Sequence, residues 1–206
     1  MQLMVCSKST KKYAAEYNFE KMIIVSKPPT IQTMKDENKY KEGIAIGGGA
    51  VIDTAKILCK ESIIAIPTTY AGACSTSHAV YWDGKKKCNA KTALPKMEIK
   101  KEWINLPKEV EMASKMDCLC HILESLISPK SNHQSNKKAM RAIEQIKKGK
   151  WIEASILAGE AIEIAGTNII HGLSYGLTAE YKLPHGVALS YILNLGLNYK
   201  KVEELL

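Results

Sequence analysis

Four side chains in the second half of the sequence have the types and spacing of a metal-binding site. Asp117 and His121 lie four residues apart in "MDCLCHILES", which places both on one face of a helix. His171 and His185 lie fourteen residues apart, and a glycine follows each of them. One carboxylate and three imidazoles suit Fe²⁺ or Zn²⁺, and this ligand chemistry does not choose between the two ions. An Asp/His pair alone is common, so the prediction depends on all four residues.

The other histidines and the cysteines have simpler interpretations. His133 lies in a polar stretch and is expected to be solvated. His78 follows a loop and is expected at the surface or in packing, with a place lining the nucleotide crevice as the alternative. The six cysteines show no disulfide framework. Cys118 and Cys120 are separated by a single residue, which matches neither zinc-knuckle nor thioredoxin spacing. We expect buried, reduced thiols.

A run of three glycines has the features of a phosphate-binding loop. In "GIAIGGGAVIDTAK", Gly47, Gly48 and Gly49 lie between an expected buried strand and an expected helix. Glycines allow close backbone approach to a ligand, and N–H groups at a helix start favour phosphate. The G-x-G-x-x-G dinucleotide fingerprint is absent. A tight strand-to-helix turn explains the same glycines without a ligand, so both interpretations stay open.

A second polar loop, "IPTTYAGACSTSHAV", follows the next expected strand. Ligands of open α/β sheets bind beyond the carboxyl ends of the strands. Thr68, Thr69 and Ser77 are therefore candidates to bind a base, ribose or phosphate. The alternative is a turn in which the hydroxyl groups bond to their own backbone.

Hydrophobic patterning predicts an α/β domain over residues 1–106 and an all-α domain over residues 107–206. The expected strands are residues 2–7, 21–26, 42–46 and 62–67. The expected helices of the first domain are residues 10–18, with Thr10 as N-cap, and 51–60. Strand-like runs stop near residue 107. The expected helices beyond it are residues 107–128, residues 137–149 after a polar loop at 128–136, and one long helix or a pair over 150–177.

Composition excludes several classes of protein. The net charge is +8, but all 29 basic residues except Arg141 are lysines. Arginine is the commonest reader of base edges, so we expect no sequence-specific nucleic-acid binding. No apolar run approaches the roughly 20 residues that a membrane-spanning helix needs. The first residues lack a signal-peptide pattern, and we therefore expect a cytoplasmic protein without membrane association.

Taken in order, these motifs resemble the iron-containing (group III) alcohol dehydrogenase family. "GGGAVIDTAK", "IPTT", "MDCLCHILES" and "HGLSYGLTAEYKLPHG" are similar to the family patterns GGGSxxDxAK, IPTTxGTGSE, DALxHAIES and a late H…HG pair. The resemblance extends from about residue 20 to residue 199. It is greatest to the branch that includes phosphonoacetaldehyde reductases, which also has Ser-Tyr where many relatives have a further histidine.

The resemblance implies a dehydroquinate-synthase-like fold with an N-terminal nucleotide-binding domain and a C-terminal helical metal-binding domain. It implies reversible hydride transfer between NAD(H) or NADP(H) and a small alcohol or its aldehyde or ketone. Many members form dimers or larger oligomers. The implied residues are Asp117, His121, His171 and His185 for the metal, and Gly47, Gly48, Gly49, Ala50, Thr68, Thr69, Ser77 and Lys86 for the cofactor, with Lys85 and Lys87 as rivals of Lys86.

Tyr175 lies where many relatives of that family place a histidine, one helical turn after His171. It is expected near the substrate, either as the group that supplies a proton or as packing at the wall of the site. A tyrosine of ordinary pKa, about 10, would be a slow acid.

Several features depart from the family pattern. Ala50 replaces the family serine, the glutamate of the second motif is missing, and the spacing from Asp117 to His171 is compressed. The helical domain is expected to be truncated relative to the family. Three interpretations remain open: a compact reductase, a truncated or degraded relative that binds nucleotide or metal without catalysis, and a helical interaction module. The substrate and the choice of NAD or NADP are not determined. The +8 charge is compatible with a phosphonate or phosphate aldehyde.

Overall fold

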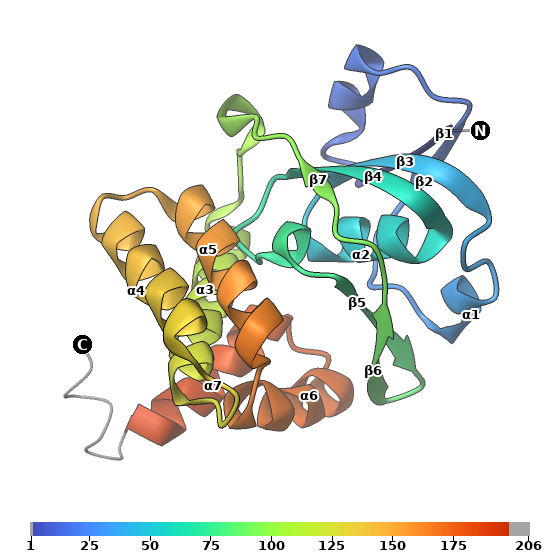
Figure 1. Cartoon of the computed structure of the whole chain (residues 1–206). Helices are drawn as coiled ribbons and strands as arrows, with labels where there is room; N and C mark the ends of the chain where they lie inside the picture. Colours follow the sequence, from blue (N-terminus) through green and yellow to red (C-terminus); the bar gives the residue numbers. More distant parts are fainter. Residues whose placement is uncertain (1, 198–206) are drawn as a thin grey trace. The chain divides into compact units, whose positions relative to one another are not determined.

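The computed structural model describes residues 2–197 and divides the chain into two compact units, residues 1–106 and residues 107–206 (Figure 1). The first unit contains a parallel sheet with short helices, and the described part of the second unit is helical. This is the predicted order of an α/β region followed by an all-α region. In the part of the chain that the structure describes, no helix is both long and apolar enough to cross a membrane.

A five-stranded parallel sheet forms the centre of the first unit (Figure 1). Its spatial order is β2-β1-β3-β4-β7, built from β2 (Lys21–Ile24), β1 (Gln2–Cys6), β3 (Tyr40–Gly47), β4 (Cys59–Pro67) and β7 (Lys96–Met97). Buried residues continue without alternation through residues 3–6 of β1 and residues 43–47 of β3, because these parts of the strands are covered on both faces. Since neighbouring strands are parallel, the chain leaves β1, β3 and β4 at the same edge of the sheet.

Short elements complete the first unit. They are η1 (Lys11–Glu16), α1 (Ile31–Met34), α2 (Gly49–Leu58), η2 (Ala73–Ser75), η3 (Lys101–Trp103) and the antiparallel hairpin of β5 (His78–Asp83) and β6 (Lys86–Lys91). The ring of Trp103 stacks on Tyr13 with centroids 4.4 Å apart. These rings close one side of a core that includes Met4, Ile44 and Ile66.

The helix expected over residues 10–18 is instead a short 3-10 helix, η1, and Thr10 does not cap it. Thr10 occupies the N-cap position, but no hydrogen bond runs from its side chain to the helix start. Its hydroxyl donates to the carbonyl of Ile46 at 2.6 Å. A tertiary hydrogen bond therefore takes the hydroxyl that the local pattern assigned to capping. This bond connects the loop after β1 to the end of β3.

A buried lysine ties α2 to the segment that follows β4. The Nζ of Lys56 donates to the carbonyls of Ala73 and His78 and to the hydroxyl of Thr76. The same Nζ lies 3.6 Å from Oδ1 of Asp53, one turn earlier on α2. The other carboxylate oxygen of Asp53 accepts from the N–H of Val80 at 3.1 Å. One buried ion pair thus holds residues 73–80 against α2.

Residues 107–197 of the second unit form five helices: α3 (Lys108–Ile127), α4 (His133–Lys147), α5 (Trp151–Ala165), α6 (Ile169–Tyr181) and α7 (His185–Leu197) (Figure 1). Helix α5 packs against α3 and α4, and α7 packs against α3 and α6. Five alanines, at positions 139, 142, 154, 158 and 161, are fully buried with Cys118 and Ile122 between α3, α4 and α5. Small side chains permit the close approach of these helices.

One predicted boundary in this unit needs correction, and one of the two alternatives for residues 150–177 is confirmed. The polar loop expected over residues 128–136 is shorter, because α4 begins at His133. Asn132 caps that helix by accepting from the N–H groups of Gln134 and Ser135. His133 is exposed, as expected. The apolar stretch over residues 150–177 is a pair of helices, and the chain turns between them at Gly166, whose φ is 72°.

Five of the six cysteines are buried, which agrees with the sequence interpretation, and Cys88 in β6 is partly exposed. Burial raises the pKa of Cys59 and of Cys118 to about 12. Since the thiolate is the reactive form, we expect only Cys88 to react rapidly with a thiol reagent in the native protein. The number of thiols labelled in the fast phase of the reaction checks this, and Cys88→Ser should abolish that phase. Two or more fast thiols would contradict it.

Candidate metal centre

One face of α3 carries three ionisable side chains that meet in the second unit. Asp117, His121 and Glu124 follow the spacing i, i+4 and i+7, and all three are buried. This spacing keeps side chains on one helical face. The sequence predicted the helix and the shared face of Asp117 and His121, and both are confirmed. Helices α6 and α7 bring His171 and His185 to the same face.

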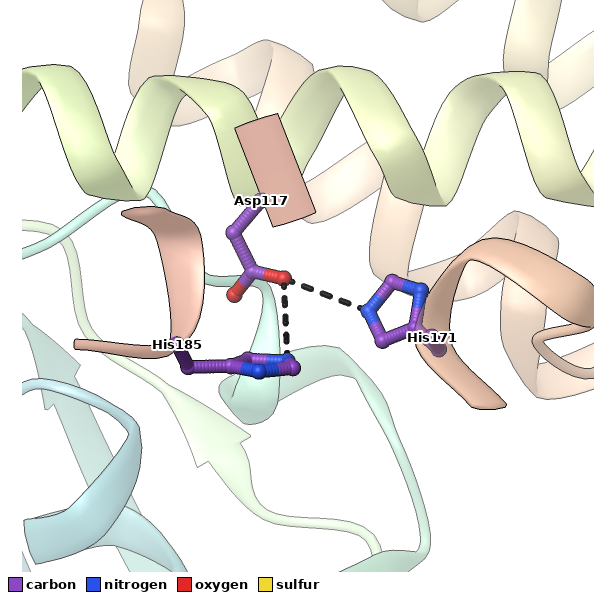
Figure 2. Close-up of side chains that lie close together, drawn as sticks. All are labelled: Asp117, His171 and His185. Atoms are coloured by element: carbon purple, nitrogen blue, oxygen red, sulfur yellow. Dashed lines mark hydrogen bonds and ion pairs between the residues drawn. The ribbon is translucent and has the colours of Figure 1, made fainter. Parts of the chain in front are cut away.

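Asp117 lies at the centre of the predicted set, as Figure 2 shows for its contacts with His171 and His185. Its Oδ1 is 3.3 Å from Nε2 of His171, 3.5 Å from Nε2 of His121 and 3.8 Å from Nε2 of His185. Three of the four residues, Asp117, His171 and His185, offer ligand atoms that all lie within 4.8 Å of one another. A single cation is able to contact these three atoms at once.

His121 lies beside this group of three. Its ring stacks on the ring of His171, with centroids 4.7 Å apart and planes 9° from parallel. Its Nε2 shares the same carboxylate oxygen as the other two imidazoles. Three imidazole nitrogens therefore lie within 3.8 Å of one carboxylate oxygen, and one carboxylate with three imidazoles is a set that Fe²⁺ and Zn²⁺ both accept.

The electrostatics of the set favour a charged carboxylate. Burial alone would raise the pKa of Asp117, but the three imidazoles outweigh it and hold that pKa well below its usual range. Burial would lower the pKa of His171, but its hydrogen bonds to Asp117 and Glu124 raise it. The ionised carboxylate is the form that binds a cation.

The four predicted ligands differ in how far their side chains are exposed. The side chain of His171 is 3% exposed, whereas the side chain of His185 is 31% exposed. His185 is therefore the most exposed of the four predicted ligands.

Glu124 is the residue of the site that sequence reasoning missed. It is fully buried, and its Oε2 contacts Nδ1 of His171. Its Oε1 accepts from the backbone N–H groups of Ile170 at 2.6 Å and His171 at 3.1 Å. Burial would raise the pKa of Glu124, but these bonds lower it. Its position seven residues after Asp117 was the available signal.

Tyr175 lies next to His171 and His185, and its place near the substrate stays a prediction. Its ring centroid is 6.0 Å from that of His185 and 6.4 Å from that of His171. Burial raises the pKa of Tyr175 to about 12, although a hydrogen bond with Thr167 acts in the opposite direction. A phenol of this pKa is a weaker acid than an ordinary tyrosine.

The predicted cofactor residues Gly47, Gly48, Gly49 and Ala50 lie at the end of β3 and in the first turn of α2. A Cβ on Gly48 would lie 2.9 Å from Cγ2 of Thr69, and one on Gly47 would lie 2.7 Å from Cγ2 of Val51. Packing within the chain thus explains two of the glycines without a ligand. No side chain caps the start of α2, and N–H groups at such a helix start favour an anion.

The structure brings Thr68 and Thr69 to this glycine loop but places Lys86 elsewhere. The N–H of Thr68 donates to the carbonyl of Gly47 at 3.1 Å. Ser77 lies just before β5, and its carbonyl accepts from Thr92. Lys86 is exposed at the start of β6 and pairs in register with Asp83. Of the three hairpin lysines, Lys87 is the one whose charge lowers the pKa of Asp53.

The part of the chain that contains these residues matches a known protein family. Residues 111–204 match the model of the Fe-containing alcohol dehydrogenase family, C-terminal. This range includes all four predicted metal ligands and Glu124.

Two curated relatives match most of the chain. The 1-propanol dehydrogenase PduQ of Salmonella typhimurium is 30% identical over 181 residues, covering 73% of this chain and 49% of the relative. The 4-hydroxybutyrate dehydrogenase of Clostridium kluyveri is 25% identical over 196 residues, covering 74% of this chain and 53% of the relative. The chain therefore spans about half the length of the curated relatives that it matches.

A solved structure confirms the predicted fold class. The sulfoacetaldehyde reductase of Bifidobacterium kashiwanohense, in complex with NAD⁺, superposes with a TM-score of 0.79 at 21% identity, covering 91% of this chain and 66% of the other. The order of the sequence motifs, the match to the family model and the shared fold all indicate the same family. The chain belongs to the iron-containing alcohol dehydrogenase family.

Proposed function

We propose that this protein is a metal-dependent oxidoreductase that transfers hydride between NAD(H) or NADP(H) and a small alcohol or its aldehyde. The observation that carries the proposal is the arrangement of three imidazole Nε2 atoms around one oxygen of Asp117. Residues 1–106 would serve as the nucleotide-binding domain and residues 107–206 as the metal-binding domain.

The proposed ligands are Asp117, His121, His171 and His185, and the proposed ion is Fe²⁺ or Zn²⁺. When bound, such an ion polarises the carbonyl of an aldehyde as a Lewis acid. The protein's own contribution is to hold the donors in place and to exclude water. Burial of Asp117, His121 and His171 supports the second role, and the exposure of His185 supplies access for the substrate.

The proposed cofactor site comprises the glycine loop with its neighbours: Gly47, Gly48, Gly49, Ala50, Thr68, Thr69, Ser77 and Lys86. The uncapped start of α2 supports binding of the pyrophosphate there. The relative whose structure contains NAD⁺ supports a dinucleotide as the ligand. Lys86 has the least structural support of the eight, because it is exposed at the far end of the hairpin.

For Tyr175 we propose a place at the wall of the substrate site. The stacking of its ring beside His185 supports this position. Its raised pKa argues against proton donation by the phenol alone.

The proposed substrate class is a small aldehyde that carries an anionic group, such as a phosphonate or phosphate. The +8 net charge supports an anionic ligand. One relative is a reductase of sulfoacetaldehyde, which is also an anionic aldehyde. We further propose action in the cytoplasm, where reduced cysteines persist, and a homodimeric state, which the family resemblance implies.

The second candidate function is binding of metal or nucleotide without turnover. It is favoured by the short spacing between Asp117 and His171 relative to the family pattern.

Aldehyde-dependent oxidation of NADH or NADPH by the metal-loaded protein tests the proposal. We expect His171→Ala to lower this rate more than about 100-fold. Removing a residue that only hydrogen-bonds to a metal ligand already lowers metal affinity or activity by about 10–100-fold, and His171 is a proposed ligand itself. His133→Ala, which changes an exposed histidine on α4, should have no effect. Metal and nucleotide binding without oxidation of any small aldehyde would support the second candidate. Absence of both kinds of binding would contradict both candidates.

A further inference from the structure

One carboxylate oxygen of Glu124 contacts the backbone at the start of α6, and the other contacts the ring of His171. Helix α6 begins at Ile169, and Asn168 at its N-cap position makes no capping hydrogen bond. The N–H groups of Ile170 and His171 are among those that a helix start leaves without an intrahelical partner. Both donate to Oε1 of Glu124 from α3. Glu124 therefore supplies the cap that the local sequence does not.

The second oxygen of Glu124 acts on the imidazole itself. Oε2 contacts Nδ1 of His171, and the opposite ring nitrogen, Nε2, faces Oδ1 of Asp117 at 3.3 Å. Both neighbours are carboxylates, which have only acceptor atoms, and the contact at Nδ1 is the shorter of the two, so the proton of a neutral His171 lies on Nδ1. Nε2 then keeps the lone pair that a metal requires.

We infer that Glu124 is the positioning residue that fixes both the tautomer and the ring orientation of His171, and so makes Nε2 the ligand atom. This inference rests on the proposed metal site. One carboxylate holds the start of α6 and the histidine on its first turn, so α3 positions the donor group through both Asp117 and Glu124. Hydrogen-bonded partners of metal-ligating histidines commonly contribute 10–100-fold to metal affinity.

Glu124→Gln separates the two roles. The amide oxygen of glutamine is able to accept from the same two backbone N–H groups, which keeps the cap. The amide nitrogen is a donor and would face Nδ1, so the proton of His171 should move to Nε2. We expect Zn²⁺ to bind about 10–100-fold more weakly to this variant. Glu144→Gln, which removes one exposed carboxylate from α4 of the same unit, should bind Zn²⁺ like the wild type.

The ¹⁵N shifts of His171 in metal-free protein supply a readout that a purely structural role would not move. At a pH that leaves the ring neutral, we expect a proton on Nδ1 in the wild type and on Nε2 in Glu124→Gln. A proton on Nε2 in the wild type would overturn the inference, even if the variant did not fold. Unchanged tautomer and unchanged Zn²⁺ affinity in a folded Glu124→Gln would also overturn it. If the wild type bound no metal, the proposed metal site itself would fail, whereas wild-type binding with an unaffected variant would remove only the role of Glu124.

Discussion

Replacing Lys56 with methionine is expected to lower the free energy of unfolding of the first unit by about 3–5 kcal/mol. Lys56 is fully buried, and its ammonium group donates to two carbonyls and a hydroxyl of residues 73–78. Methionine has nearly the same length but no donor. The change leaves Asp53 without its buried counterion, and removing one partner of a buried pair typically costs this amount.

The loss of unfolding free energy in Lys56→Met should depend on pH, and the ionisation of Asp53 determines the direction of that dependence. Burial raises the pKa of Asp53, while Lys56 and the N–H of Val80 act in the opposite direction. Loss of Lys56 should raise that pKa further. A carboxyl with a raised pKa in the folded state binds more protons there than in the unfolded state, so stability falls as pH rises above the usual carboxyl range. The deficit of Lys56→Met should therefore be smaller at mildly acidic than at mildly alkaline pH.

Urea unfolding followed by tryptophan fluorescence checks this prediction. In a Trp151→Phe background, Trp82 and Trp103 report on the first unit alone. Lys60→Met removes an exposed lysine near the start of β4 and should change stability by less than about 0.5 kcal/mol. Adding Asp53→Asn to Lys56→Met should recover about 1 kcal/mol or more, because it removes the unpaired buried charge. Equal unfolding midpoints for Lys56→Met and Lys60→Met would contradict the account.

Gly186→Ala is expected to separate α7 from α3 locally and to displace His185. A Cβ at this position would lie 2.0 Å from the carbonyl oxygen of Ala113 on α3. Alanine improves helix propensity by up to about 1 kcal/mol. A clash with backbone cannot be relieved by rotation of a side chain, and overpacking costs about 1–3 kcal/mol or more. The clash should win, which destabilises the second unit.

Gly176→Ala on α6 is the matched control, since nothing lies within 4 Å of its Cβ position. It should leave stability unchanged or raise it by about 0.5–1 kcal/mol. Hydrogen exchange of α7 should become faster in Gly186→Ala but not in Gly176→Ala. The Zn²⁺ affinity of Gly186→Ala should also fall, because His185 is part of α7 and its Nε2 moves when that helix is displaced. An alanine at 186 that proved as stabilising as one at 176 would refute the predicted clash.

Local pattern predicted much of what positions the site. The change from a continuous apolar run to helical spacing located β3, the glycine loop and α2. The spacing of Asp117 and His121 placed them on one face of α3, and the structure brings His171 and His185 to that face. Metal binding by these residues stays a prediction.

Long-range contacts account for what the sequence did not reveal. Lys56 and Asp53 are charged residues of a short helix, and their polar partners come from residues 73–80, which fold against α2. The contacts of Glu124 are with α6, which lies more than forty residues later in the chain. A tertiary bond likewise takes the hydroxyl of Thr10 away from capping. No local period encodes such partners.

The X-ray absorption spectrum of the zinc-loaded protein at the zinc edge tests the central claim most directly. Asp117, His121, His171 and His185 predict one ion per chain with nitrogen and oxygen neighbours at about 2.0–2.2 Å, multiple scattering from imidazole rings and no sulfur. His171→Ala should lose part of the imidazole signal. Sulfur at about 2.3 Å, from Cys118 or Cys120, or a shell of oxygen atoms without imidazole, would contradict the account.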